Sequence, residues 1–366
     1  MNIDKIVLKH NKLLIKIKNF LEKENFRNEF SSGLIQPRFN YTYSPSAAHH
    51  IIDDIIVFKK ESHLPIDNFY ILPDRSIRVN DAKNVGISSR HLSFFELLVF
   101  GSVGAAENLS KEKSVELLCN LMFNVLGLDK NKILVTILHS CEAEGIKLTE
   151  EEDEIFYNTY INHLGKDRIF RTIGQRNLFY SRIIDNPGST GCEIYYKIGN
   201  KYIEIGSHVN YKFKFTGQLK RTRNQAVLEG FGFERLLMAL ENKDNIYDIS
   251  LIFPLKKILL DYFKSINDNS INLFEENLNI IIDHIRTISF IIFDGQELDN
   301  SSRGRILKRF IKNLHGQFVY LGVNKKDEFK IINKLINVLI KLFSERYNGF
   351  SSNKNNIINF IKRIIK

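Results

Sequence analysis

Residues 230–237 read Gly230-Phe231-Gly232-Phe233-Glu234-Arg235-Leu236-Leu237 and form the most specific local pattern in the chain. Its two glycines allow the backbone to pass close to a flat or phosphorylated ligand, because glycine has no Cβ atom that would clash. Arg235 stands where helical apolar spacing begins, so its guanidinium can lie on an aromatic base or reach a phosphate. Taken alone, the run is also compatible with an ordinary helix entry in which Glu234 and Arg235 form a surface ion pair.

A second segment with nucleotide-binding chemistry precedes it. Arg78 is followed, after a polar loop, by Ser89-Arg90-His91-Leu92-Ser93-Phe94-Phe95-Glu96. An arginine on one strand and an aromatic ring on the returning strand can bracket a nucleotide, with the guanidinium on the α-phosphate and the ring on adenine. The alternative is an ordinary hairpin with phenylalanines in its core. Because the chain contains 28 Phe, Phe95 alone does not decide between them.

The apolar patterning predicts a mixed architecture. Residues 193–215 alternate around a Gly199-Asn200 turn, which indicates a β-hairpin. Beyond residue 253 the sequence is helical by pattern. We therefore expect an α+β fold, in which an antiparallel sheet flanked by helices (residues 1–252) is followed by an all-helical domain (residues 253–366). Further helices are predicted over residues 1–25, 114–126 and 150–164, and a buried strand over residues 134–138.

The charge is concentrated in the helical third. The chain carries a net charge of +10, and residues 253–366 hold 19 Lys and Arg against 11 Asp and Glu. A basic segment attached to a nearly neutral body suggests a polyanionic partner such as nucleic acid. The alternative is an AT-rich coding bias, which raises Lys, Asn and Ile together.

Several classes of protein are disfavoured by the sequence. Cys119, Cys141 and Cys192 are far apart and form no zinc-binding or disulfide pattern, so no metal site is predicted. The N-terminus lacks the features of a signal peptide, and no apolar run is long enough to span a membrane. We expect a cytoplasmic protein without a membrane partner.

Together, the two segments resemble motifs two and three of class II aminoacyl-tRNA synthetases, and most closely those of alanyl-tRNA synthetases. Residues 77–98 look like the second motif, and residues 185–196 look like the family's Gly-rich loop and the strand after it. Residues 31–37 are similar to the first motif, with one extra residue before Pro37. Residues 283–309 look like the helical tRNA-docking segment. The resemblance covers roughly residues 20–325 and keeps the family's order throughout.

The resemblance implies an adenylate-forming ligase that uses ATP and Mg²⁺. An amino acid, alanine or a related small acid, would be activated as its adenylate and transferred to tRNA. No protein nucleophile is needed, because positioning and charge stabilisation carry the reaction, with Arg78 and Arg235 as catalytic residues. Glu193 or Glu96 would contribute a carboxylate to magnesium. The residues implied at ATP are Arg78, Arg90, His91, Phe95, Glu96, Gly230, Gly232, Glu234 and Arg235.

The amino-acid side departs from the family's pattern. The family places an Asp that pairs with the substrate's α-ammonium where this chain has Leu228. Glu229 is adjacent, but neighbouring residues of a strand point to opposite faces. Ser207 replaces the family's pocket Asn, and Phe179 or Tyr180 replaces its Trp. The implied amino-acid pocket comprises Phe179, Tyr180, Glu193, Ser207, Val209, Leu228 and Glu229.

The acceptor of the acyl group is left open by the sequence. The resemblance implies tRNA contacts at Asn300, Arg303, Arg305, Lys308, Arg309 and Lys312, four of which share a helix face that could follow phosphates. The alternative for this face is a solvated helix surface. The family's editing and C-terminal domains have no counterpart within the 366 residues. Three functions remain: transfer to a tRNA acceptor stem, transfer to a carrier protein or amine in a biosynthetic pathway, or a catalytically silent tRNA-binding paralog.

Overall fold

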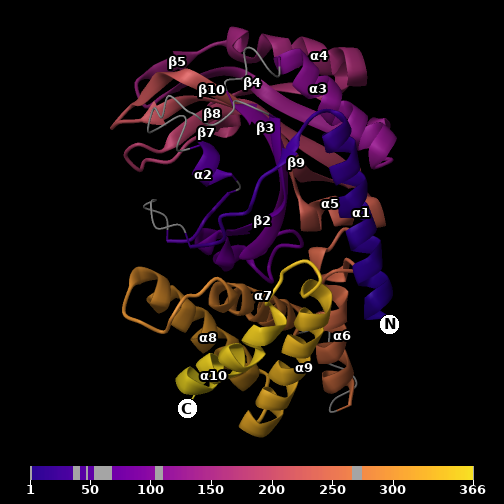
Figure 1. Ribbon diagram of the computed structural model, residues 1–366, viewed down its shortest axis with the longest axis vertical. Helices are drawn as coiled ribbons and strands as arrows, with labels where there is room; N and C mark the ends of the chain where they lie inside the picture. Colours follow the sequence, from indigo (N-terminus) through magenta and orange to yellow (C-terminus); the bar gives the residue numbers. More distant parts are fainter. Residues whose placement is uncertain are drawn as a thin grey trace.

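The computed structural model describes residues 2–35, 42–46, 48–52, 68–103, 110–265 and 274–365. Gln36 and Pro37, which belong to the run that resembles the first motif, lie outside the described residues. Figure 1 shows a part that carries the sheet and, below it, a part made of helices. Helix α1 (Ile3–Lys23) runs along the side of both parts.

Within the described residues, the sheet has ten strands in the order β1-β2-β3-β10-β9-β8-β4-β5, with β6 beside β4 and β7 beside β8. The central neighbours are antiparallel, as expected, whereas β1–β2 and β4–β6 are parallel. The strands are β1 (Arg27–Asn28), β2 (Asn68–Ile77), β3 (Phe94–Val103), β4 (Ile133–Ala143), β5 (Ile146–Leu148), β6 (Ile169–Ile173), β7 (Leu178–Phe179), β8 (Pro187–Ile198), β9 (Lys201–Phe215) and β10 (Leu219–Gly232).

The predicted hairpin is formed by β8 and β9. Ile198 pairs with Lys201 across a two-residue turn, and Gly199 there has a φ of +57°. Such a positive φ is what a tight hairpin turn requires, and glycine adopts it without steric cost. The hairpin alternation directs Glu193 and its partner Ser207 to one face and Cys192 and His208 to the other.

One face of the sheet is covered by helices. They are α3 (Lys111–Asn120), α4 (Glu154–Leu164), α5 (Phe233–Glu241) and α1, with a four-residue helix α2 (His49–Ile52) elsewhere. The helix predicted over residues 114–126 is shorter than expected as an α-helix. Residues 121–125 form a π-helical turn, closed by the Leu126 N–H donating to the Leu121 carbonyl. This turn lets the chain reverse before Gly127, whose φ is +73°.

The helical part confirms the expectation for the C-terminal third. It consists of α6 (Phe253–Lys264), α7 (Glu275–Phe293), α8 (Ser302–Tyr320), α9 (Lys325–Phe343) and α10 (Lys354–Ile365). Its core is continuous with the core of the sheet, because Phe290 stacks on Phe94 with ring centroids 4.0 Å apart. The domain boundary at residue 252 therefore stays a prediction, although helix α6 begins at Phe253. None of the helices in the described ranges is long and apolar enough to cross a membrane.

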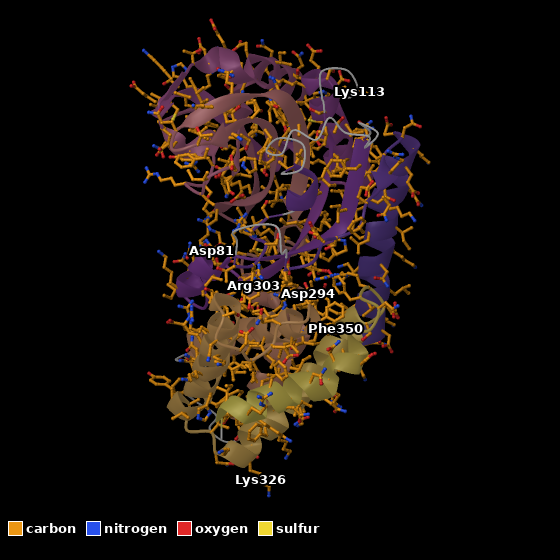
Figure 2. The ribbon with its side chains drawn as sticks, turned by 60° about the vertical axis from the view of Figure 1, so that its left-hand side comes forward. Asp81, Lys113, Asp294, Arg303, Lys326 and Phe350 are labelled. Carbon is orange, nitrogen blue, oxygen red and sulfur yellow. The ribbon has the colours of Figure 1, made fainter. Side chains whose placement is uncertain are left out.

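A polar contact joins the two parts at their junction. Arg75 of β2 donates to the carboxylate of Asp294 at 2.8 Å, and Asp294 also accepts from the backbone N–H of Leu34 at 2.6 Å. Figure 2 places Asp294 and Arg303 where the sheet meets the helices. The Arg75 guanidinium also lies 4.9 Å from the ring centroid of Tyr347. The helical part is thus held to the sheet by buried charge as well as by apolar packing.

Candidate active site

A cavity of about 610 Å³ opens on the sheet face away from α3 and α4. Its floor is made by β3, β8, β9 and β10, and strand alternation decides which side chains reach it. On β3 these are Phe95, Leu97 and Val99. Phe94 and Leu98, which alternate with them along the strand, belong to the apolar core on the opposite face.

One end of the cavity is cationic. Arg78, Arg90 and Arg235 line it together with His91 and Phe95. The guanidinium of Arg78 lies 5.1 Å from the Phe95 ring centroid, and its Nε donates to the Pro45 carbonyl at 3.0 Å. Burial and the charge of Arg235 lower the pKa of His91, so its imidazole adds no charge at neutral pH. The positive charge at this end therefore comes from three arginines, a group suited to phosphates.

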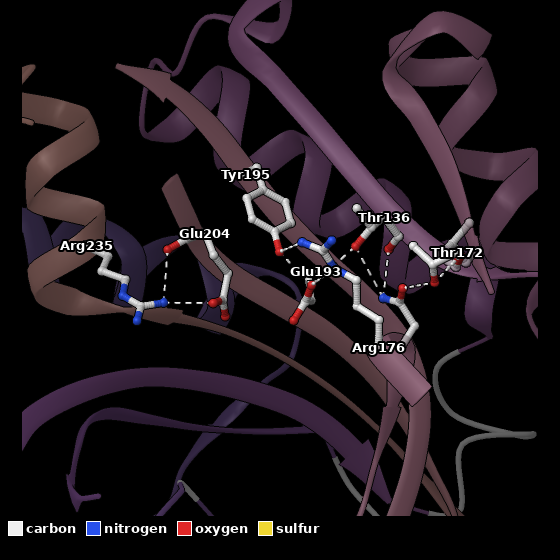
Figure 3. A network of polar contacts seen from close by, with 9 residues as sticks. Thr136, Thr172, Arg176, Glu193, Tyr195, Glu204 and Arg235 are labelled. Atoms are coloured by element: carbon white, nitrogen blue, oxygen red, sulfur yellow. Dashed lines mark hydrogen bonds and ion pairs between the residues drawn. The ribbon is translucent and has the colours of Figure 1, made fainter. Parts of the chain in front are cut away.

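Arg235 and Glu193 sit in two separate hydrogen-bond groups along the cavity wall (Figure 3). Arg235 donates to the Glu204 carboxylate at 2.8 Å. The carboxylate of Glu193 accepts from the Tyr195 hydroxyl at 2.6 Å and from Nε of Arg176 at 3.3 Å. Both acidic groups are therefore already paired with protein donors.

Two residues expected at the nucleotide direct their carboxylates elsewhere. Glu96 is fully buried and does not line the cavity, because it follows Phe95 on β3 and points to the other face. Its carboxylate accepts from Arg346 and from the Tyr347 hydroxyl. The expectation of a nucleotide contact from Glu96 is therefore corrected. Glu234 borders the cavity, but its carboxylate is buried against Arg286 at 2.5 Å.

The other end of the cavity is apolar. Leu228 on β10 is paired across the sheet with Val209 on β9, and both line the cavity. Val99 and Leu97 of β3 pack in the same apolar cluster as Leu228. Phe179 and Tyr180 border the cavity, and Ser207 lies opposite Gly230. The structure thus brings six of the expected pocket residues to one cavity, namely Phe179, Tyr180, Glu193, Ser207, Val209 and Leu228.

Glu229 does not supply a carboxylate to this pocket. It borders the cavity, but its carboxylate is buried on the opposite face, 3.5 Å from Nε2 of His208. Burial raises the pKa of Glu229 well above its ordinary value and lowers that of His208 to about 3, so His208 is neutral at pH 7. His208 also contacts the hydroxyls of Ser114 at 2.9 Å and Tyr160 at 3.1 Å. Strand alternation predicts this orientation. Because the carboxylate points away from the cavity, the assignment of Glu229 as a pocket residue is wrong.

Comparison with known proteins supplies the family. The model of the family described as tRNA synthetases class II (A) matches residues 56–364. The chain belongs to the class II tRNA synthetases. Its arginine-lined cavity on an antiparallel sheet is therefore the candidate active site of a synthetase.

Among characterised proteins, this class II chain is similar to alanine–tRNA ligases. It is 30% identical over 310 residues to the enzyme of Prochlorococcus marinus subsp. pastoris and 29% identical over 321 residues to that of Malacoplasma penetrans. Both matches cover 79% of this chain and 32% of the relative, so the chain spans about a third of their length. Among solved structures, apo histidyl-tRNA synthetase of S. aureus is similar with a TM-score of 0.43 and 11% identity, over 66% of this chain and 72% of that chain.

Sequence reasoning missed several residues of this synthetase cavity. Glu204 and Arg176 hold the side chains of Arg235 and Glu193, and neither belongs to a motif that the sequence displays. Two more of them are Ser189, near the start of β8, and Asn186, directly before β8, and both line the cavity. Periodicity could have found Ser189, because it shares a strand face with Glu193. No local signal identifies Arg176.

The residues expected to contact tRNA lie on and before α8. Arg305, Arg309 and Lys312 are exposed, and Lys308 is half-buried. Asn300 is exposed and joined to this face, since its carbonyl accepts from Arg305 at 2.6 Å and its side chain accepts from Lys308 at 3.1 Å. Arg303 is directed elsewhere, because its Nε donates to the Thr42 carbonyl. The structure therefore assembles the basic face without Arg303.

Proposed function

We propose that the protein activates a small carboxylic acid of about the size of alanine with ATP, as an acyl adenylate, and transfers the acyl group to tRNA. The observation that carries this proposal is the division of one cavity into two ends. Arg78, Arg90 and Arg235 line one end beside the Phe95 ring, and Leu228 and Val209 line the other. Such a site suits a nucleotide triphosphate lying next to a small, weakly polar acyl group.

The positions of Phe95 and Arg235 suggest how ATP would lie. Adenine would stack between them, and the α-phosphate would lie against Arg78. Arg78 now rests on the Phe95 ring, so it would have to leave that ring for the phosphate. The lost cation–π contact is worth about 0.5–1 kcal/mol, which a charge-assisted hydrogen bond to phosphate offsets.

The reaction itself needs no protein nucleophile. The substrate carboxylate would attack the α-phosphorus in line, forming the acyl–phosphate bond as pyrophosphate leaves. Arg78 and Arg235 would stabilise the charge that develops on the phosphate oxygens. Cys192 is fully buried on the helix-covered face, and burial raises the pKa of its thiol well above the ordinary value. A thiolate at this residue is therefore not part of the proposed reaction.

Magnesium would accompany the ATP phosphates and screen their charge. Of the two carboxylates considered for it, Glu96 does not fit, because Arg346 and Tyr347 occupy both of its oxygens. Glu193 lines the cavity and is the remaining candidate, with Tyr195 and Arg176 as its present partners. Its carboxylate would exchange the Arg176 contact for the metal when the nucleotide binds.

The acceptor is proposed to be a tRNA acceptor stem. The exposed guanidinium and ammonium groups of Arg305, Arg309 and Lys312 on α8 form a continuous basic face with Asn300. A polyanion is the partner that such a face attracts most strongly. A carrier protein or amine as acceptor, and a silent tRNA-binding paralog, are the alternatives that the experiment below separates.

Two assays test this proposal. ATP–pyrophosphate exchange with a panel of small acids measures adenylate formation, and acylation of transcribed tRNA measures transfer. Wild-type protein should support exchange with at least one acid, Arg235→Ala should abolish it, and Arg363→Ala, an exposed arginine on α10, should not change it. Exchange without tRNA acylation would favour another acceptor. tRNA binding without any exchange would identify a silent paralog.

A further inference from the structure

The carboxylates that border the cavity decide which charge its acyl end can accept. There are five among the described residues: Asp81, Glu193, Glu204, Glu229 and Glu234. Three of them are paired with arginine. Glu193 contacts Arg176, Glu204 contacts Arg235, and Glu234 contacts Arg286. Their negative charges are thus already compensated by the protein.

The other two carboxylates do not face the acyl end. The Glu229 carboxylate is buried on the opposite face of the sheet, 3.5 Å from Nε2 of His208. Asp81 lies in the 3₁₀ turn that directly follows Arg78, where its backbone N–H donates to the Arg78 carbonyl at 3.0 Å. It therefore belongs to the cationic, nucleotide end.

Leu228 occupies the centre of the acyl end. Across the sheet, Leu228 pairs with Gly101 of β3 on one side and with Val209 of β9 on the other, and Val209 pairs in turn with Gly191 of β8. A Cβ atom at Gly101 would lie 3.1 Å from Cγ of Leu228, so the leucine side chain covers this glycine. Only 4% of Leu228 is exposed. A substrate group placed here would meet methyl groups and backbone, and no charged side chain of the described residues faces it.

Neutral polar groups lie beyond Leu228. Ser189 pairs with Tyr211 in the next row of the sheet, on the side away from Glu193. Ser189 and Asn186 both line the cavity and are buried, and the Ser189 hydroxyl and the Asn186 amide nitrogen have no hydrogen-bond partner among the described residues. A buried donor without a partner is costly, so these two groups are suited to a ligand oxygen.

We propose that the acyl end selects a carboxylic acid without an ammonium group, such as a short aliphatic or hydroxy acid. An ammonium group placed against Leu228 would lose its water and gain no carboxylate, which is strongly unfavourable. A methyl or hydroxyl group at the same place carries no such penalty. This inference rests on the proposed function and specifies its substrate class.

The test compares acyl groups that differ only at one atom. The 5′-O-(N-acylsulfamoyl)adenosines with propionyl, lactyl and alanyl groups carry hydrogen, hydroxyl and ammonium at the same carbon, and their acyl–nitrogen bond does not react onward. Isothermal titration calorimetry gives their dissociation constants. We expect the propionyl or lactyl compound to bind wild-type protein at least tenfold more tightly than the alanyl compound.

Two substitutions of nearly equal size assign the effect to charge. Leu228→Asp should shift the preference to the alanyl compound, whereas Leu228→Asn, which adds polarity without charge, should not. Equal or tighter binding of the alanyl compound to wild-type protein would overturn the inference, as would no binding of any of the three. Exchange of pyrophosphate is measured separately. If the propionyl or lactyl compound binds selectively but no acid supports pyrophosphate exchange, the proposed activity is rejected, whereas the inference about acyl selectivity is retained.

Discussion

Arg346 donates a hydrogen bond to the carboxylate of Glu96, with Nη1 and Oε2 2.6 Å apart, across 250 residues of sequence. Both side chains are buried, and the Tyr347 hydroxyl occupies the second carboxylate oxygen. Phe95, which precedes Glu96, borders the nucleotide end of the cavity. The strand that carries Phe95 is thus fixed from behind by the segment between α9 and α10.

Replacing Arg346 with methionine should destabilise the protein strongly. The change removes one partner of a buried ion pair and leaves the Glu96 carboxylate unpaired. Such losses typically cost about 3–5 kcal/mol in the free energy of unfolding. Urea denaturation followed by circular dichroism measures this quantity. Arg363→Met, an exposed arginine on α10, is the matched control and should change it by less than about 0.5 kcal/mol.

A second variant tests whether the effect comes from the unpaired charge. Glu96→Gln combined with Arg346→Met replaces the ion pair with neutral groups, so it should recover part of the stability that Arg346→Met loses. A double variant no more stable than Arg346→Met would mean that packing around Arg346, not the Glu96 charge, dominates.

Gly191 should not tolerate even a methyl group. A Cβ atom at this residue would lie 2.2 Å from the His208 carbonyl oxygen and 2.7 Å from the Cα atom of Val209. Because both contacts are with backbone, β8 and β9 would have to separate, and Gly191→Ala should cost at least about 3 kcal/mol. Gly316→Ala is the control, since no atom lies within 4 Å of that site on α8. It should stabilise the helix by about 0.5–1 kcal/mol.

His208 makes the protein sensitive to mild acid. Burial lowers its pKa from 6.5 to about 3 in the folded protein. The unfolded chain therefore takes up a proton below pH 6.5 that the folded protein does not bind, and stability falls as the pH falls through this range. At pH 5 the loss from this residue amounts to about 2 kcal/mol. Unfolding by urea at pH 7.5 and pH 5 should show a smaller difference for His208→Gln than for wild type.

A smaller contribution with the same sign is expected from His10. Its pKa is lowered to about 4, mainly by burial, with the Arg346 charge adding to the effect. The His208→Gln variant should therefore remain somewhat acid-sensitive. If its stability difference between the two pH values equals that of wild type, His208 is protonated in the folded protein and the argument from burial is wrong.

The exposed basic face of α8 should set the salt dependence of tRNA binding. Arg309→Ala combined with Lys312→Ala removes two exposed cations, so the slope of log affinity against log salt concentration should decrease by roughly 1.5. Filter binding at several salt concentrations measures it. Lys326→Ala with Lys330→Ala changes two exposed lysines on α9, and Figure 2 shows Lys326 at the far tip of the helical part. An equal decrease in this control would show that the attraction is not specific to α8.

The sequence predicts local structure and strand faces better than distant partners. Alternation identified the β8–β9 hairpin and indicated that Glu229 points away from Leu228, although the resemblance assigned Glu229 to the pocket. The same rule should have separated Glu96 from Phe95, but the resemblance assigned both to the nucleotide. The Arg346 contact could not be foreseen, because nothing within a local window indicates which buried carboxylate a residue so far along the chain will meet.

The charge at Glu96 also bears on how the protein is synthesised. A ribosome delivers β3 long before it delivers Arg346, so on the nascent chain Glu96 has neither of its two final partners. An unpaired carboxylate in an apolar setting resists dehydration, which keeps β3 from closing over the core. The order of translation therefore leaves Glu96 without both of these partners until residue 347 has emerged, so its charge is compensated only after most of the chain has been made.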